Sequence, residues 1–254
     1  MALFIIITIF LALAAGFAMY LVNQDKGERE PIKALWAAFG FGALGTVAAV
    51  FLELWLLPNV TNHVVPLSTL AFTTFGIGVI EECAKALPLI FFIYRKRYFN
   101  EHTDGVIYFG LAGLGFGLPE NILYTLQFGA KAGIARIALT PLFHAATTAV
   151  IGYALIRCKL DKQPKLRVIK VVTVVALLHG FYDFGLMSGV GILQLLAVAV
   201  TVAFTVNLFV IFKKAKALDE QQGLSVVGNN SFCRTCGHPN PKHNLYCSRC
   251  GNRA

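Results

Sequence analysis

The chain has 254 residues, of which 57% are hydrophobic and only 14% are charged. A mean hydropathy of +0.67 exceeds what the core of a soluble protein requires, so the composition predicts a membrane protein. The net charge of +9 follows from 22 Lys and Arg against 13 Asp and Glu. Its distribution, described below, explains this charge without a nucleic-acid partner.

Long apolar segments recur along the whole chain. A helix needs about 20 apolar residues to cross about 30 Å of hydrocarbon. No alternation with a period of two residues indicates strands, and within lipid only helices and closed barrels satisfy their own backbone hydrogen bonds. The sequence therefore predicts an all-α, polytopic bundle of about seven transmembrane helices, with segments at 2–22, 34–57, 67–94, 105–127, 135–157, 168–187 and 189–212.

The first segment, 2–22, needs separate consideration because it begins the chain. It has no basic region before its apolar stretch, and that stretch is longer than the core of a signal peptide usually is. We therefore expect a retained transmembrane helix. Cleavage near Ala14, Ala15 and Gly16 stays open as the alternative.

Basic residues gather in every second connection. They lie at 26–33, 95–97, 157–170 and 213–216, whereas 58–66 and 187–189 contain none and 128–136 contains only Lys131 and Arg136. Because cytoplasmic loops carry the excess of Lys and Arg, this pattern predicts an external amino terminus and a cytoplasmic carboxyl terminus.

The third segment contains two adjacent carboxylates, Glu81 and Glu82, in the middle of an apolar run. Ionisable residues at this depth are costly, so they indicate a functional site by default. Lys85 lies four residues after Glu81, which places both on one helix face where they can pair and offset part of the burial cost.

Three further segments carry polar groups deep in their apolar stretches. Each group lies between about 14 and 24 Å from one end of its segment at about 1.5 Å per residue, so all come to rest between the midplane and the outer half of the membrane. We expect these helices to present acid, amide and imidazole groups at one level. The groups are Glu120 and Asn121 in the fourth segment, His144 in the fifth, and His179 and Asp183 in the sixth. Tyr124 lies one turn beyond Glu120, where it can cap the same site.

A few polar residues fit simpler interpretations. Glu53 lies near the outer end of the second segment and is expected to be interfacial or structurally paired. Asp104 suits the amino-terminal end of the fourth helix because of the helix dipole, and His102 is expected in a loop. A lone histidine on an apolar helix is often a core residue, so His144 indicates a site only together with the others.

The carboxyl-terminal region has a different composition. Residues 1–216 form the expected membrane domain, 217–231 a polar linker, and 232–254 a second module. This module contains two CxxC pairs, each followed by glycine, a spacing that is typical of a tetrahedral zinc site in a short zinc ribbon. A disulfide pair or an unmetallated thiol cluster is the alternative, although a reducing cytoplasm disfavours the disulfide. The expected structural zinc ligands are Cys233, Cys236, Cys247 and Cys250.

Four stretches together resemble a known family. VIEECAKALPL at 79–89, DGVIYFGLAGLGFGLPENILY at 104–124, RIALTPLFHAATTAVIGYAL at 136–155 and LLHGFYDF at 177–184 are similar, in order and spacing, to the motifs of the PrsW family of intramembrane proteases. That family is related to CAAX prenyl proteases and bacteriocin-processing enzymes. The likeness covers roughly residues 75–185, so the first helices and the zinc ribbon lie outside it.

The resemblance implies peptide-bond hydrolysis within or beside a prokaryotic cell membrane, with an anti-sigma-factor-like membrane protein as substrate. The distribution of charge and the few basic residues of the ribbon predict no nucleic-acid partner, and a cytosolic partner bound through the zinc ribbon is the remaining expectation. Carried over by position, the catalytic candidates are Glu81, Glu82, Glu120, His144 and His179, supported by Lys85, Asn121, Tyr124 and Asp183.

Two mechanisms and two other functions remain open from the residues. In one mechanism His144, His179 and a carboxylate hold a second zinc ion that activates water. In the other, Glu81 or Glu82 activates water directly while His179 with Asn121 or Asp183 polarises the carbonyl group. A proton-coupled or ion-coupled transporter uses similar buried groups, and an inactive membrane scaffold with a zinc-ribbon recruitment module is the third function.

Overall fold

The computed structural model describes residues 2–24, 30–60, 65–222, 224, 230–232 and 239–241. Within these ranges the chain forms seven helices and two short strands. The predicted all-α bundle is confirmed, and all seven predicted segments are helical. The elements are α1 (Ala2–Asn23), α2 (Ile32–Leu56), α3 (Leu67–Phe92), α4 (His102–Phe128), α5 (Ala130–Leu160), α6 (Lys165–Met187), α7 (Gly191–Gln221), β1 (Asn230–Phe232) and β2 (Pro239–Pro241).

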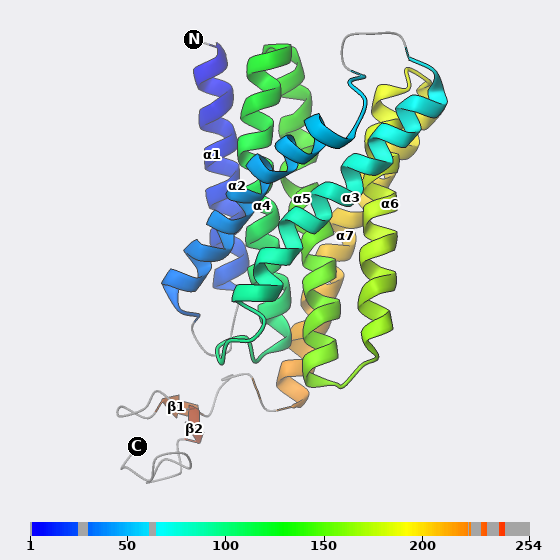
Figure 1. The fold of residues 1–254 in the computed structure, drawn as a ribbon. Helices are drawn as coiled ribbons and strands as arrows, with labels where there is room; N and C mark the ends of the chain where they lie inside the picture. Colours follow the sequence, from blue (N-terminus) through cyan, green and yellow to red (C-terminus); the bar gives the residue numbers. More distant parts are fainter. Residues whose placement is uncertain are drawn as a thin grey trace.

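The helices run alternately up and down, so that the start of α1 and the end of α7 lie at opposite ends of the bundle (Figure 1). Five helices in the described part of the chain are long and apolar enough to cross a membrane, and six if the bent α5 counts as one span. The remaining helix, α3, carries Glu81, Glu82 and Lys85 near its middle.

Helix α4 forms the centre of the bundle. It packs against α1, α2, α3, α5 and α7, and residues 102–117 are buried without interruption. Lipid tails are as apolar as leucine, so helices in a membrane associate through close packing at small residues. A Cβ atom on Gly113 would lie 2.1 Å from the backbone oxygen of His144 in α5, so only glycine permits this approach. The glycine on this face of α4 therefore determines how closely the backbone at His144 approaches α4.

A polar cluster joins the start of α4 to the end of α7. Asp219 accepts hydrogen bonds from the backbone N–H groups of His102 and Thr103, at 2.7 and 3.0 Å, and from the side chains of both residues. The His102 ring also contacts Asp161 at 3.0 Å. His102 is thus a fully buried residue of this cluster and not the loop residue expected from the sequence.

Asp161 lies just beyond the end of α5. Partial burial raises the pKa of its carboxyl group, but hydrogen bonds from Gln222, His102 and Arg157 outweigh this effect and hold the pKa below its usual range. The cluster therefore ties the ends of α4, α5 and α7 together through charged groups.

The cluster also corrects one boundary. The predicted linker begins at residue 217, but α7 continues to Gln221. The physical reason is that Asp219 is buried and caps the free N–H groups at the start of α4, which holds the last turn of α7 in place. The short strands β1 and β2 pair antiparallel. The four predicted zinc ligands, Cys233, Cys236, Cys247 and Cys250, lie outside the described residues.

We expect Asp219→Ala to lower the free energy of unfolding by about 3 kcal/mol, because it leaves buried donors of His102 and Thr103 without an acceptor. In a domain of this size that corresponds to a fall of roughly 5–10 °C in the unfolding midpoint, measured by intrinsic fluorescence in detergent.

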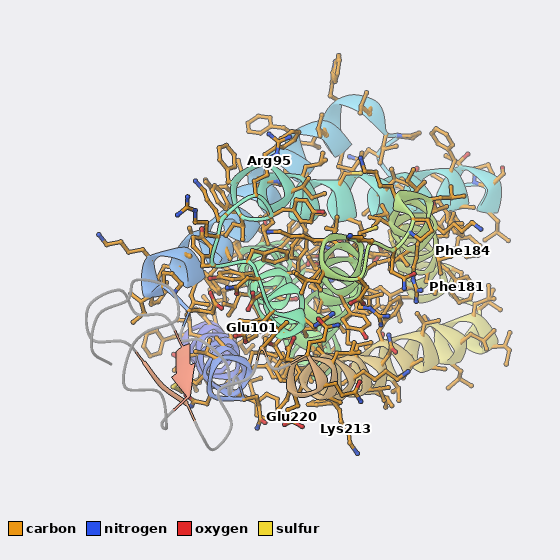
Figure 2. All side chains as sticks on the ribbon, turned by 90° about the horizontal axis from the view of Figure 1, so that it is seen from below. Arg95, Glu101, Phe181, Phe184, Lys213 and Glu220 are labelled. Carbon is orange, nitrogen blue, oxygen red and sulfur yellow. The ribbon has the colours of Figure 1, made fainter. Side chains whose placement is uncertain are left out.

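The matched control is Glu220→Ala, one residue further along the same turn. Glu220 is exposed and, like Lys213, lies on the outer side of α7 (Figure 2). Its removal should change stability by less than about 0.5 kcal/mol. Equal effects of the two substitutions would contradict the capping role of Asp219.

Candidate active site

The charged residues of α3 form a closed network. The Lys85 ammonium group lies 3.1 Å from Oε2 of Glu81 and 3.0 Å from Oε1 of Glu82, and all three residues are buried. The helical spacings of three and four residues bring these side chains together on one face, as the sequence predicts for Glu81 and Lys85. The Phe116 ring, 4.3 Å from Nζ, covers the ammonium group.

His144 enters this network from α5. Its Nδ1 atom lies 2.9 Å from Nζ of Lys85 and 3.9 Å from Oε2 of Glu81, and its Nε2 atom lies 2.7 Å from Oε2 of Glu120. An ammonium group only donates, so Nδ1 of the neutral ring is the acceptor and Nε2 carries the proton. His144 therefore links the carboxylates of α3 to Glu120 of α4.

His179 approaches from α6. Its Nδ1 atom lies 2.7 Å from Oε1 of Glu82, and its Nε2 atom lies 3.5 Å from Oε2 of Glu81 and 3.6 Å from Oδ2 of Asp183. The short contact with Glu82 assigns the ring proton to Nδ1. Nε2 is then the nitrogen that faces Glu81.

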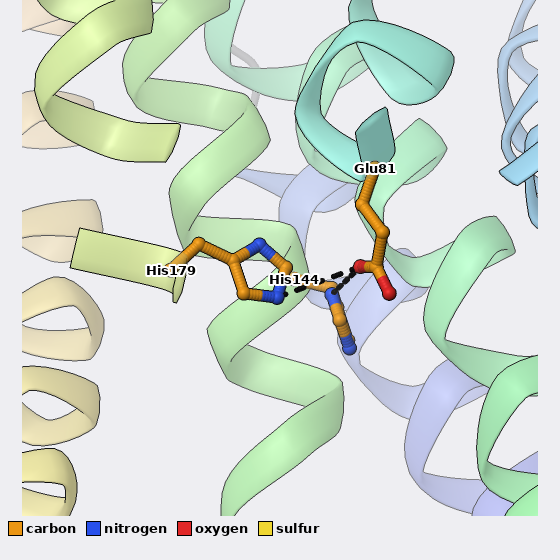
Figure 3. A group of neighbouring side chains, drawn as sticks. All are labelled: Glu81, His144 and His179. Atoms are coloured by element: carbon orange, nitrogen blue, oxygen red, sulfur yellow. Dashed lines mark ion pairs between the residues drawn. The ribbon is translucent and has the colours of Figure 1, made fainter. Parts of the chain in front are cut away.

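Three potential metal ligands converge as a result. Glu81, His144 and His179 point toward one another from three different helices (Figure 3). Each offers one ligand atom, these atoms lie within 4.8 Å of one another, and all three residues are buried. Two imidazoles and one carboxylate form a donor set that catalytic zinc sites use, with a fourth position left for water or substrate.

The surroundings of this trio also suit a metal ion. Metal-binding histidines usually direct their second nitrogen at a carboxylate, and here His179 contacts Glu82 while His144 contacts Glu120. The formal charges agree, because the carboxyl groups of Glu81, Glu82, Glu120 and Asp183 outnumber the cationic side chains of Lys85 and Arg136 by two. The donor types and formal charges therefore fit a divalent cation, which would take the lone pair of His144 Nδ1 that here accepts from Lys85.

The fourth helix contributes a second group of contacts. Arg136 binds Oε1 of Glu120 at 2.5 Å and donates from Nε to Oδ1 of Asn121 at 2.6 Å. Its guanidinium carbon lies 3.9 Å from the centre of the Tyr124 ring, so Tyr124 covers this ion pair. All the predicted catalytic and supporting residues thus belong to one connected cluster; their roles remain predictions.

Sequence reasoning missed two members of this cluster. The sequence places Arg136 in an external loop, but the structure places it in α5, bound to Glu120. External loops of this chain contain almost no Lys or Arg, so the presence of Arg136 was the available signal for a buried partner. The sequence indicates an interfacial or structurally paired Glu53, whereas its Oε1 atom is buried, has no hydrogen-bond partner among the described residues, and lies within electrostatic range of Glu120 and Asp183. An apolar helix with one glutamate was the only signal for Glu53.

Comparison with known proteins identifies the family of the chain. The model of the PrsW family of intramembrane metalloproteases matches residues 30–212, which is more than half of the chain. The match extends beyond the motif region of 75–185 on both sides and ends before the carboxyl-terminal cysteines.

Curated relatives lie in the same family. Protease PrsW of Bacillus subtilis is 29% identical over 176 residues, covering 68% of this chain and 79% of the relative. Protease PrsW of Clostridioides difficile is 31% identical over 173 residues, with 65% and 72% covered. Protease PrsW of Shouchella clausii is 30% identical over 181 residues, with 70% and 82% covered.

No solved structure matches this chain. The family model spans the helices that carry Glu53, Glu81, Glu120, His144 and His179, so the match and the buried cluster concern the same part of the protein. The chain belongs to the PrsW family of intramembrane metalloproteases.

Proposed function

We propose that this protein is an intramembrane endopeptidase that cleaves a membrane-associated protein or peptide. The observation that carries the proposal is the convergence of Glu81, His144 and His179 from α3, α5 and α6 in a buried site. Family membership supports the same reaction class. Hydrolysis requires a water molecule that loses a proton as its oxygen attacks the carbonyl carbon, and a proton for the amide nitrogen as the C–N bond breaks.

Glu81 is the proposed base that takes the proton from water and returns it to the amide nitrogen. Its Oε2 atom faces both histidines, whereas Oε1 of Glu82 is occupied by His179 and Lys85. Glu82 therefore orients His179, and Lys85 balances the charge of the two carboxylates. Glu120 orients His144 in the same way.

We further propose that His144, His179 and a carboxylate of the cluster hold a zinc ion. When bound, zinc acts as a Lewis acid that acidifies water and polarises a carbonyl group. The histidine nitrogens and carboxylate oxygens around the trio support this assignment. Direct activation of water by Glu81 without metal is the alternative outcome of the zinc measurement below.

The carboxyl-terminal module is proposed to be a cytoplasmic zinc ribbon, with a second zinc held by its four cysteines, that recruits a protein partner. The CxxC spacing and the basic residues near 95–97 and 157–170 support this structure and orientation. The proposed substrate class is an anti-sigma-factor-like membrane protein, because the family resemblance implies such a substrate.

We expect Glu81→Gln, His144→Ala and His179→Ala each to reduce cleavage by about 10²–10⁴-fold, the usual contribution of a catalytic acid or base. Lys85 keeps its contact with Glu82 in the first of these variants, so folding should persist. Cleavage is followed with fluorescein-labelled casein in dodecyl maltoside and by mapping new amino termini in membranes of the expressing cells.

Glu220→Gln is the matched control, since it makes the same chemical change at an exposed position. It should cleave like the unmodified protein. If Glu81→Gln cleaves casein and membrane proteins at the unmodified rate, the protein is not this protease. Loss of ion flux in proteoliposomes in the absence of any cleavage would instead identify a transporter, and no change in either would identify a scaffold.

Zinc stoichiometry tests the metal assignments. We expect two zinc ions per full chain, one after Cys233→Ser with Cys236→Ser, and none when His144→Ala and His179→Ala are added, because each change removes ligands from one site. Measurement is by plasma emission spectrometry on purified protein. One ion in the full chain that disappears with the cysteines would contradict the membrane site.

A further inference from the structure

Asn121 has an unusual environment within the cluster. Its side chain is 1% exposed. Its Oδ1 atom accepts from Nε of Arg136 and from the hydroxyl group of Thr140, each at 2.6 Å. Its Nδ2 atom is buried and has no hydrogen-bond partner in the described part of the chain. A buried unpaired amide donor is costly, so its retention requires an explanation.

The contact with Arg136 decides which way the amide points. A guanidinium group has only donors, so the atom facing Nε must be the oxygen of Asn121. Rotating the amide by 180° would place its NH₂ group against the N–H of Arg136. Arg136 is itself held by Glu120 at 2.5 Å and by the Tyr124 ring, so the free NH₂ group has a fixed direction.

Asn121 lies on the face of α4 that packs against His144 of α5. Gly113, Gly117 and Asn121 follow one another at four-residue spacing on α4. A Cβ atom on Gly117 would lie 2.9 Å from Cδ2 of His144, so the imidazole packs directly against this face. Side chains of a helix tilt toward its amino-terminal end, which directs Asn121 back toward the level of Gly117 and the ring.

Most other described donors of the site are hydrogen-bonded, and Nε2 of His144 lies 2.7 Å from Oε2 of Glu120. The three N–H groups of Lys85 meet Glu81, Glu82 and His144. Nδ1 of His179 donates to Glu82, and Asp183 offers a carboxyl group whose Oδ2 atom has no hydrogen-bond partner among the residues that the structure describes. Asn121 therefore supplies a neutral donor that no acceptor in the described ranges of the chain uses.

We propose that Nδ2 of Asn121 donates a hydrogen bond to the oxygen of the scissile carbonyl group, and that Arg136 and Thr140 are positioning residues that hold the amide in this orientation. The inference rests on the proposed function and adds a residue role to it. Negative charge develops on that oxygen as water attacks, so a fixed donor stabilises the transition state more than the bound substrate.

Two substitutions of Asn121 test the donor. Asn121→Asp keeps an acceptor for Arg136 and Thr140 but replaces the NH₂ group by oxygen, and Asn121→Ala removes the donor without adding charge. We expect both to lower kcat for labelled casein by about 10²–10³-fold with little change in KM. In Asn121→Ala the dependence of kcat on pH should keep its shape, because this variant neither removes the proposed base nor adds a titratable group.

Thr140 tests the positioning role. Thr140→Val removes the hydroxyl contact at nearly constant volume and should lower kcat by about fivefold, as expected for one hydrogen bond, while Thr140→Ser should restore it. In the Asn121→Asp background, Thr140→Val should have no further effect on kcat, since the donor it orients is already absent.

Several outcomes would overturn the inference. They are near-normal kcat in either Asn121 variant that retains its unfolding midpoint, a change confined to KM, or equal effects of Thr140→Val in both backgrounds. Glu81→Gln separates this result from the parent proposal. If Glu81→Gln abolishes cleavage while the Asn121 variants do not, only the role of Asn121 is wrong.

Discussion

The buried ammonium group of Lys85 is the interaction on which the site depends. It is completely enclosed, and its three contacts join Glu81 and Glu82 of α3 to His144 of α5. Without this cation two adjacent carboxylates would face each other at membrane depth with no compensation inside their own helix. The single positive charge of Lys85 compensates both carboxylates, and the two carboxylates have different contacts. Glu82 binds His179, whereas Glu81 faces the rings of His144 and His179.

The close packing of α4 against α5 fixes the position of His144 in this charged network. Gly113 and Gly117 let the backbone and ring of His144 lie directly against the helix, and Asn121 follows on the same face. The position of the imidazole is therefore set by backbone contact, which cannot relax as a flexible side chain can. Polar groups from four helices share one site because α4 passes through the middle of the bundle.

Local spacing explains what could be predicted from the sequence. Glu81 and Lys85 are four residues apart on one helix, and counting residues from the helix ends placed His144 and His179 at the level of the carboxylates. Arg136 could not be placed in this way. It reaches Glu120 because α4 and α5 are joined at Gly129, which has a positive φ of 83°, and because the first part of α5 is bent by 48° from the rest. Similarly, the partner of His102 lies 117 residues away, and no local pattern connects them.

The cap that Asp219 forms on α4 has a consequence for exchanging modules between relatives. The composition of the chain suggests a joint at residue 217, yet a chimera joined there would lose the acceptor for the first N–H groups of α4. A joint after Gln222 keeps both Asp219 and the contact of Gln222 with Asp161. The folded unit of the membrane domain thus extends into the polar stretch, because α7 ends at Gln221, five residues beyond the predicted domain boundary at residue 216.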